Sequence, residues 1–153
     1  MTPTLTLVIP CYRESDRFEA GPFHRFLDST PGARLLLVDD GSPDDTLARL
    51  REAARLNPDR IGVLALDRNV GKGEAVRRGL LHALNDSPDL VGFWDADLAA
   101  PLEAVGDFLR VFETRPAVQW VLGSRWRGLG REVRRSAGRH YAGRGFATLA
   151  SAV

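Results

Sequence analysis

Two aspartates separated by one residue, Asp95 and Asp97, follow an apolar stretch that ends in Trp94. Two carboxylates held this close repel each other in a partly desolvated site unless a cation neutralises them. Such oxygen ligands suit Mg²⁺ or Mn²⁺, and these ions in turn bridge phosphate oxygens. The alternative is a solvated turn whose two acids cap the helix that begins near Pro101. The pattern indicates either a divalent cation site or a capping turn.

A second acidic turn, Asp39-Asp40-Gly41-Ser42, follows another apolar stretch. A carboxylate placed here can accept a hydrogen bond from a nucleobase N–H or from a ribose hydroxyl. The turn can also serve the helix that follows, with Ser42 or Asp44 as its cap. Nucleoside binding and helix capping are both compatible with this turn.

The third pattern, Gly71-Lys72-Gly73, opens a predicted helix. Small residues at an exposed helix N-terminus, together with an ammonium group, favour an anion such as phosphate. Lys72 is the one lysine among 21 basic residues, so a compact, flexible ammonium occurs only here. The segment is not a Walker motif, because the spacing Gly-X-X-X-X-Gly-Lys-Ser/Thr is absent. A flexible turn carrying a surface lysine is the alternative.

Short apolar runs alternate with longer amphipathic segments, which explains how these patterns could meet. The predicted strands are Leu5–Pro10, Leu35–Asp39, Ile61–Leu66, Leu90–Trp94 and Val118–Gly123, and the predicted helices are Asp16–Ser29, Asp44–Asn57, Gly71–Leu84 and Pro101–Thr114. This alternation predicts an α/β fold with a mostly parallel sheet flanked by helices. Right-handed crossovers bring the carboxyl ends of all strands to one edge, where ligands of such sheets bind. The polar residues after each strand are therefore predicted to form one site.

Composition is that of a soluble globular protein, and its 153 residues suffice for one domain spanning 1–153. The single cysteine, Cys11, excludes an intramolecular disulfide. No apolar run reaches the roughly 18 residues that a transmembrane helix needs.

The charge is uneven along the chain. Between Arg125 and Arg144 there are seven arginines and one acid, whereas the whole chain has a formal net charge of +1. The final segment, Glu132–Val153, is predicted to be helical. This asymmetry favours an anionic partner, unless the segment is simply a solvated basic helix face. Nucleic acid is not the expected partner, because no recognition motif or interleaved aromatic platform accompanies the arginines.

Taken together, these segments resemble glycosyltransferase family 2 of the GT-A fold. The matching motifs, in chain order, are Val8-Ile9-Pro10-Cys11-Tyr12-Arg13-Glu14, Val38-Asp39-Asp40-Gly41-Ser42, Asn69-Val70-Gly71-Lys72-Gly73, Asp95-Ala96-Asp97 and Gly123-Ser124-Arg125. Within the family the chain is most similar to the polyprenyl- or dolichyl-phosphate sugar transferases, and to the dolichyl-phosphate glucosyltransferase branch in particular. Ala99 stands where the mannosyl branch often has a glutamine that ligates the metal. The resemblance therefore favours UDP-glucose over GDP-mannose as the donor.

The resemblance also implies a role for each matching residue. Pro10, Tyr12 and Glu14 would line the nucleoside pocket, Asp40 would contact the base, and Ala96 would lie beside the donor. Asp97 would ligate Mg²⁺ or Mn²⁺ directly, and Asp95 would hold the ribose or metal-bound water. Lys72 and Arg125 would face the phosphates, so that Asp95, Asp97 and Arg125 form the catalytic set. Arg139 and Arg144 would bind an acceptor phosphate.

The implied reaction is the inverting transfer of a sugar, glucose in the favoured reading, from its nucleotide to polyprenyl phosphate. It would take place in the cytoplasm at the inner face of the membrane, which the arginine-rich segment would contact. Glu132 is the only carboxylate after Arg125, so no obvious general base serves a hydroxyl acceptor, whereas a phosphate acceptor needs none. A family 2 transferase with a hydroxyl acceptor is one alternative. The other is a nucleotide-sugar-binding fragment without turnover, because relatives usually continue further and residues 1–153 would then lack a C-terminal part.

Overall fold

The computed structural model describes residues 3–123. The predicted helix Glu132–Val153 and the predicted site residues Arg125, Arg139 and Arg144 lie outside the described residues. The chain divides into two units, Met1–Arg110 and Val111–Val153. The sheet, its core and the cleft described below all belong to the first unit.

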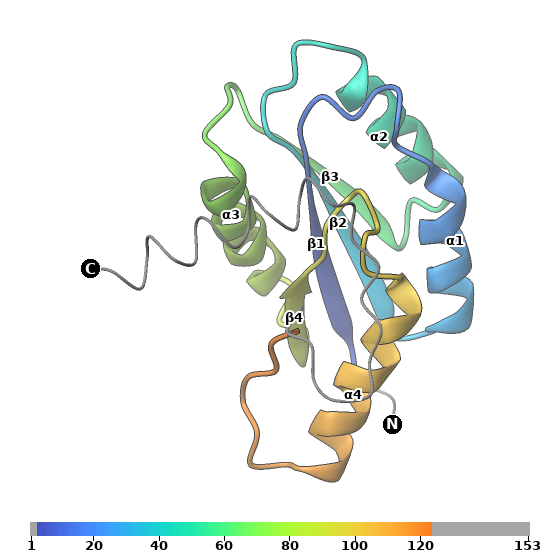
Figure 1. The fold of residues 1–153 in the computed structure, drawn as a ribbon, viewed down its shortest axis with the longest axis vertical. Helices are drawn as coiled ribbons and strands as arrows, with labels where there is room; N and C mark the ends of the chain where they lie inside the picture. The colour runs from blue at the N-terminus through green and yellow to red at the C-terminus, as the bar shows by residue number, and fades with distance from the viewer. Residues whose placement is uncertain (1–2, 124–153) are drawn as a thin grey trace, which may run out of the picture. The chain divides into compact units, whose positions relative to one another are not determined.

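A parallel sheet of four strands forms the centre of the first unit (Figure 1). The strands are β1 (Leu5–Cys11), β2 (Ala33–Asp39), β3 (Ile61–Ala65) and β4 (Leu90–Phe93), in the spatial order β3-β2-β1-β4. The two central strands, β1 and β2, are buried along almost their whole length. Near-continuous runs of Val, Ile and Leu are what strands covered on both faces require. The predicted α/β fold is confirmed.

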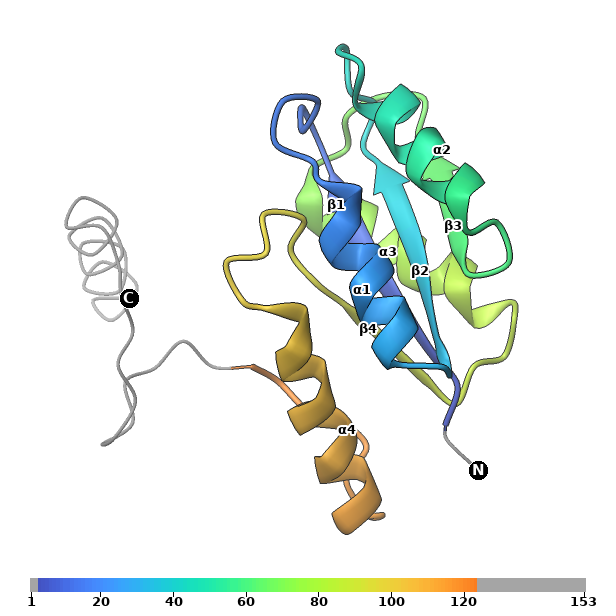
Figure 2. The ribbon, with the colours of Figure 1, turned by 90° about the vertical axis from the view of Figure 1, so that its right-hand side faces the viewer.

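Helices cover both faces of the sheet. They are α1 (Ala20–Ser29), α2 (Thr46–Leu56), α3 (Lys72–Leu84) and α4 (Val105–Thr114), the last preceded by the short 3₁₀ turn η1 (Leu102–Ala104). Figure 2 shows α1 and α2 in front of the sheet and α3 behind it. Phe23, Leu27 and Leu50 pack on the first face, whereas Ala75 and Ala83 of α3 pack against Val8 and Val38 on the second. Because successive side chains of a strand point to opposite faces of the sheet, they contribute to two separate hydrophobic cores.

The order of the strands creates a switch point between β1 and β4. The chain winds outward from β1 to β2 and β3, and then returns to place β4 on the other side of β1. The N–H of Trp94, just after β4, donates to the carbonyl oxygen of Val8 at 2.9 Å. Doubly wound sheets bind ligands at the carboxyl ends of the strands where the winding reverses. The loops after β1 and β4 meet at that place.

The predicted fifth strand is wrong, because Val118–Gly123 forms no strand with any described residue. Trp120 and Leu122 are each 84% exposed. A strand is held by backbone hydrogen bonds to a neighbour and by burial of one face, so an apolar, β-prone sequence does not form one by itself.

All four helices begin later than their amphipathic patterns predict. The expected helix Gly71–Leu84 begins one residue later, at Lys72, and the expected helix Pro101–Thr114 starts as the turn η1 and becomes α-helical at Val105. The expected helix Asp16–Ser29 begins at Ala20, because the N–H groups of Arg17 and Phe18 close a turn onto the carbonyl oxygen of Glu14. The expected helix Asp44–Asn57 begins at Thr46. The Asp44 carboxylate accepts from the N–H and the hydroxyl of Thr46 at 3.2 and 2.6 Å, so it serves the first residue of that helix.

Within residues 3–123, no helix combines the length and the apolar character needed to cross a bilayer.

Candidate active site

A cleft lies where the loops after β1, β2 and β4 meet the beginning of α3. Its lining residues are Pro10, Cys11, Tyr12, Glu14, Asp40, Asn69, Lys72, Asp95, Ala96 and Asp97. Every predicted site residue that the structure describes is among them. No role was predicted for Cys11 or Asn69, although each lies inside a motif that supplies other lining residues. The structure thus gathers four separate segments around one cavity.

The loop after β1 is fastened to the segment that follows β2. The N–H of Asp40 donates to the carbonyl oxygen of Cys11 at 2.9 Å. Further along, the N–H of Arg13 donates to the Ser42 hydroxyl at 3.1 Å, and the N–H of Glu14 donates to the Thr46 hydroxyl at 2.8 Å. Ser42 therefore holds this loop and does not cap α2. These contacts fix the backbone that carries Tyr12 and Glu14 at the cleft.

Tyr12 presents an aromatic ring at the cleft and is 38% exposed. The Arg13 guanidinium lies 5.4 Å from the centre of that ring, within the range of a cation–π contact. A partly exposed ring of this kind offers a flat apolar surface with a polar hydroxyl, which suits a nucleobase or a sugar.

Cys11 forms part of the cleft wall but is not a nucleophile. Its side chain is buried. Burial raises the pKa of the thiol far above its usual value, and the nearby carboxylates of Glu14 and Asp39 raise the pKa further. Only the thiolate attacks, so Cys11 is chemically quiet in the folded protein.

The acidic turn after β2 is enclosed, with Asp39 and Asp40 each 2% exposed. The Asp40 carboxylate accepts from the N–H groups of Val70 and Gly71, at 2.8 and 3.0 Å. One oxygen of Asp39 accepts from the N–H of Ser42 at 3.3 Å, and the other has no hydrogen-bond partner among the described residues. The turn therefore binds the loop before α3 through its second aspartate.

The loop after β4 presents the closely spaced pair of aspartates. The indole N–H of Trp94 donates to the carbonyl oxygen of Ala100 at 2.8 Å, and the N–H of Ala99 donates to the Asp97 carboxylate at 3.0 Å. Leu98 adopts a left-handed backbone with φ of +49°, which costs a residue with a Cβ about 1–2 kcal/mol. The loop is thus a tight, strained turn that leaves Asp97 exposed and Asp95 half-buried.

Lys72, the first residue of α3, makes an ion pair with Asp95 across the cleft. The Nζ–Oδ1 distance is 2.6 Å, and the side chains of Lys72 and Asp95 are 61% and 26% exposed. The ammonium thus lies at the N-terminal, positively polarised end of a helix, where an anion is favoured.

The cleft carries more negative than positive charge. Among the described residues, four carboxylates, those of Glu14, Asp40, Asp95 and Asp97, line it together with one ammonium. A diphosphate is itself anionic, so binding in this cleft calls for a cation in addition to Lys72. Mg²⁺ and Mn²⁺ are typically held by one or two carboxylates, with phosphate oxygens and water completing the shell. Asp95 and Asp97 fit that requirement.

Within residues 3–123 no three side chains of His, Cys, Asp or Glu converge to form a complete metal cage. A cation at the two aspartates would therefore need further oxygens from a bound ligand or from water. This is the arrangement expected where a metal arrives with a phosphate-bearing substrate.

A second hollow of similar size lies at the opposite edge of the sheet, where the strands begin. Its main polar side chains are occupied in holding the fold. Arg60 donates to the carbonyl oxygens of Ala33 and Thr30, and Arg34 donates to the carbonyl oxygen of Asp59. The cleft at the carboxyl ends of the strands is therefore the better candidate for the active site.

Comparison with known proteins places the chain among sugar transferases. The sequence profile described as "Glycosyl transferase family 2" matches residues 6–150. An undecaprenyl-phosphate 4-deoxy-4-formamido-L-arabinose transferase of Klebsiella pneumoniae is 33% identical over 66% of this chain and 31% of its own length. A dolichyl-phosphate beta-glucosyltransferase of Saccharomyces cerevisiae is 37% identical over 51% of this chain and 26% of its own. The chain thus spans about a third or less of these relatives.

Solved structures share the fold. The crystal structure of Staphylococcus aureus TarS residues 1–349 matches with a TM-score of 0.55 and 21% identity, covering 74% of this chain and 33% of TarS. TarS in complex with UDP-GlcNAc matches with a TM-score of 0.52, covering 87% of this chain and 37% of that one. At this level of identity the likeness concerns the fold, and it confirms the predicted GT-A architecture. Because the family profile spans nearly the whole sequence, the chain belongs to glycosyltransferase family 2.

Proposed function

We propose that the cleft binds a nucleotide-diphosphate sugar with Mg²⁺ or Mn²⁺, and that the protein transfers the sugar to polyprenyl phosphate with inversion at the anomeric carbon. The observation that carries the proposal is the charge distribution of the cleft. Two closely spaced aspartates face one ammonium at a helix N-terminus, which is a site for a cation and a diphosphate together.

Each part of the donor has a corresponding group in the cleft. Pro10, Tyr12 and Glu14 would line the nucleoside pocket, where the exposed ring of Tyr12 supplies a flat surface. Asp97 and Asp95 would hold the metal, with contact to the ribose as a second role of Asp95. When bound, the metal would offset the negative charge that the diphosphate gains as the leaving group. Lys72 would add its own charge to the same group.

The reaction needs no oxidant and no additional co-reactant. An oxygen of the acceptor phosphate forms a bond to the anomeric carbon, and the bond from that carbon to the diphosphate breaks. The nucleoside diphosphate leaves with the bonding electron pair, so negative charge grows where Lys72 lies. A phosphate acceptor is already ionised and requires no general base. Arg125 would face the diphosphate, and Arg139 and Arg144 would hold the acceptor phosphate.

Two relatives support this acceptor by the activities their names state, since one acts on undecaprenyl phosphate and the other on dolichyl phosphate. UDP-glucose is the favoured donor and GDP-mannose the second, because Ala99 stands where a mannosyl-type metal ligand would be expected. The arginine-rich segment would approach an anionic membrane surface from the cytoplasm, where each arginine contributes about 1 kcal/mol.

The experiment has two steps with the full 153-residue chain. Calorimetric titration with UDP-glucose and with GDP-mannose, each with and without Mn²⁺, should show metal-dependent binding that is tighter for UDP-glucose. Incubation of radiolabelled donor with a short polyprenyl phosphate should then yield a lipid-linked sugar. Metal-dependent binding without product would mean a binding module, and product only with a hydroxyl acceptor would mean a different transferase. Absence of binding to either donor would refute the proposal.

A further inference from the structure

A left-handed backbone occurs beside a lining residue in each of the four segments that form the cleft. These positions are Arg13 after Tyr12, Gly41 after Asp40, Gly71 before Lys72 and Leu98 after Asp97, with φ of +53°, +63°, +88° and +49°. Glycine adopts such a backbone without steric cost, whereas a residue with a Cβ is strained. Ser87 is the one other described residue with a side chain in this conformation. Arg13 and Leu98 therefore each call for a compensating interaction.

Burial explains the conformation of Leu98 but not that of Arg13. The Leu98 side chain packs against the core that contains Phe23 and Leu50, so its burial offsets the strain. Arg13 is exposed. Its N–H donates to the Ser42 hydroxyl at 3.1 Å, but a glycine would donate the same hydrogen bond. What distinguishes arginine at this position is therefore its side chain.

The Arg13 side chain contacts the ring of Tyr12. The guanidinium lies 5.4 Å from the centre of that ring. Tyr12 lines the cleft, whereas Arg13 is not among the lining residues. A planar guanidinium stacks well on an aromatic face, and the contact restricts the rotamers open to a ring that is 38% exposed. A side chain that is ordered before its ligand arrives lowers the entropic cost of binding.

We propose that Arg13 is a positioning residue that holds the Tyr12 ring in the orientation that the nucleoside of the donor meets. The left-handed backbone directs the guanidinium onto that ring, and Arg13 does not itself contact the donor. The inference rests on the proposed function, since it assumes that Tyr12 lines a nucleoside pocket. It follows that arginine at this position favours binding at the expense of backbone strain.

Arg13→Gly separates binding from folding. Glycine removes the guanidinium, relieves the strain and keeps the hydrogen bond to Ser42. The affinity for UDP with Mn²⁺, measured by calorimetry, should fall about three-fold, which corresponds to the loss of an exposed cation–π contact. The urea midpoint should not fall, because the relief of strain offsets the freedom that glycine gains in the unfolded chain. A fall in both affinity and midpoint would mean that Arg13 merely supports the fold, and would overturn the inference.

The loss should concern the nucleoside and should depend on Tyr12. Arg13→Gln keeps the strain but removes the charge. It should weaken the binding of uridine, followed by chemical-shift titration, by the same factor as the binding of UDP. Inorganic pyrophosphate with Mn²⁺ should bind this variant as tightly as it binds the unaltered protein. In a Tyr12→Leu background, Arg13→Gln should have no further effect on UDP, because the ring on which the guanidinium acts is gone.

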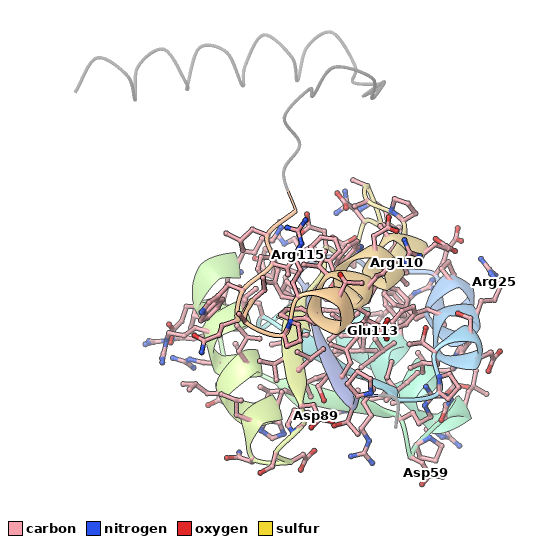
Figure 3. All side chains as sticks on the ribbon, turned by 90° about the horizontal axis from the view of Figure 1, so that it is seen from below. Arg25, Asp59, Asp89, Arg110, Glu113 and Arg115 are labelled. Carbon is pink, nitrogen blue, oxygen red and sulfur yellow. The ribbon has the colours of Figure 1, made fainter. Side chains whose placement is uncertain are left out.

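Two further variants serve as controls. Arg13→Lys keeps a cation that can contact the ring, so it should lose less UDP affinity than Arg13→Gln. Arg25→Gln removes the same charge from α1, where Arg25 projects outward (Figure 3) and does not line the cleft. It should leave UDP affinity unchanged.

The remaining outcomes are distinct. A loss of pyrophosphate affinity in Arg13→Gln would mean that the guanidinium acts on the phosphates, and losses that add in the double variant would mean that it does not act through Tyr12. Either result would overturn the inference. Unchanged UDP binding by both Arg13→Gly and Arg13→Gln would overturn it too, while leaving the proposed function in place. If the unaltered protein bound neither UDP nor GDP, the proposed function would fail and the inference with it. Should only GDP bind, the same measurements are made with GDP and guanosine.

Discussion

The two aspartates after β4 have different surroundings. Asp95 is paired with Lys72 at 2.6 Å, whereas Asp97 is exposed and accepts from the N–H of Ala99. An ammonium on Asp95 competes with a metal ion for the same oxygen, so Lys72 and the metal must share this site or separate when both bind. A bound diphosphate can then accept hydrogen bonds from the Lys72 ammonium that the metal displaces from Asp95.

Lys72→Met should therefore shift metal and nucleotide binding in opposite directions. Mn²⁺ alone should bind more tightly, because the competing cation is gone, and UDP should bind less tightly in the presence of Mn²⁺. Electron paramagnetic resonance of free Mn²⁺ measures the first effect, and calorimetry measures the second. Weaker binding of Mn²⁺ alone would mean that Lys72 does not compete at Asp95.

Asp97→Ala should abolish the metal dependence of nucleotide binding, since the variant loses the exposed carboxylate proposed as the direct metal ligand. Calorimetry with UDP, with and without Mn²⁺, is the measurement. Asp107→Ala on α4 is the matched control, because Asp107 is also an exposed acid but pairs with Arg110. If Asp97→Ala kept the affinity of the unaltered protein in Mn²⁺, Asp97 would have no part in the site.

Cys11 should resist alkylation in the folded protein, because burial raises the pKa of its thiol and only the thiolate reacts. We expect iodoacetamide to modify it at least about a hundred-fold more slowly in buffer than in denaturant. Mass spectrometry of timed samples gives both rates. Comparable rates would show that the end of β1 opens readily to solvent.

At the scale of elements, α3 approaches β1 and β2 through Gly79. A Cβ there would lie 2.4 Å from Cγ1 of Val8 and 2.9 Å from Cγ2 of Val38. Gly79→Ala should therefore lower the free energy of unfolding by about 1–3 kcal/mol through overpacking, as measured by urea denaturation.

Gly106→Ala on α4 is the control for this change, since within residues 3–123 no atom beyond its chain neighbours and the backbone of its own helix lies within 4 Å of its Cβ position. Alanine there should be neutral or stabilising by up to about 1 kcal/mol, because it favours the helix. If the two variants were equally stable, α3 would not be packed as tightly as the structure shows. Its first residue, Lys72, would then be free to shift.

Two carboxylates at the surface, the exposed Asp44 and the half-buried Glu74, link stability to acid pH. A hydrogen bond from the Thr46 side chain holds the pKa of Asp44 at about 2, against a usual 3.8, and hydrogen bonds from Arg77 and Arg78 hold the pKa of Glu74 at about 2, against 4.5. A depressed pKa in the folded state means that the stabilisation is fully present above the unfolded pKa. It is lost as the pH falls through the folded value.

The urea midpoint should therefore fall between about pH 4.5 and about pH 2. Asp44→Asn should reduce the size of that fall, because an amide does not titrate. Because both groups lie at the surface, where solvent screens their interactions, the change per residue should be small. A midpoint that rose on acidification, or a variant with the same pH dependence as the unaltered protein, would contradict the assignment.

At the scale of the whole molecule, the sheet and the position of the cleft could be predicted because their signals are local. Runs such as Leu35–Asp39 are apolar throughout, and polar residues follow each run, as in Asp95 and Asp97. Alternation then fixes the parallel order and the edge where those residues meet. The prediction of a fifth strand was wrong, because Val118–Gly123 has the composition of a strand but no partner among the described residues.

What sequence reasoning missed depends on contacts between distant segments. The hydrogen bonds from Val70 and Gly71 to Asp40 join loops 30 and 31 residues apart, and the pairing of Lys72 with Asp95 spans 23 residues. No local pattern distinguishes an acid that faces a ligand from one that accepts backbone N–H groups. The resemblance implies a base contact for Asp40, which stays a prediction, and the structure adds that its carboxylate accepts from the loop before α3.

The most direct measurement is paramagnetic broadening of backbone amide signals by Mn²⁺ in the presence of UDP. If the metal lies between the two aspartates and a bound diphosphate, the amides of Tyr12, Lys72, Asp95 and Asp97 should broaden first. Those of Asp59 and Asp89, which lie where the strands begin (Figure 3), should stay sharp. Broadening centred on Asp59 or Asp89, or none at the loop after β4, would contradict a metal–diphosphate site in this cleft.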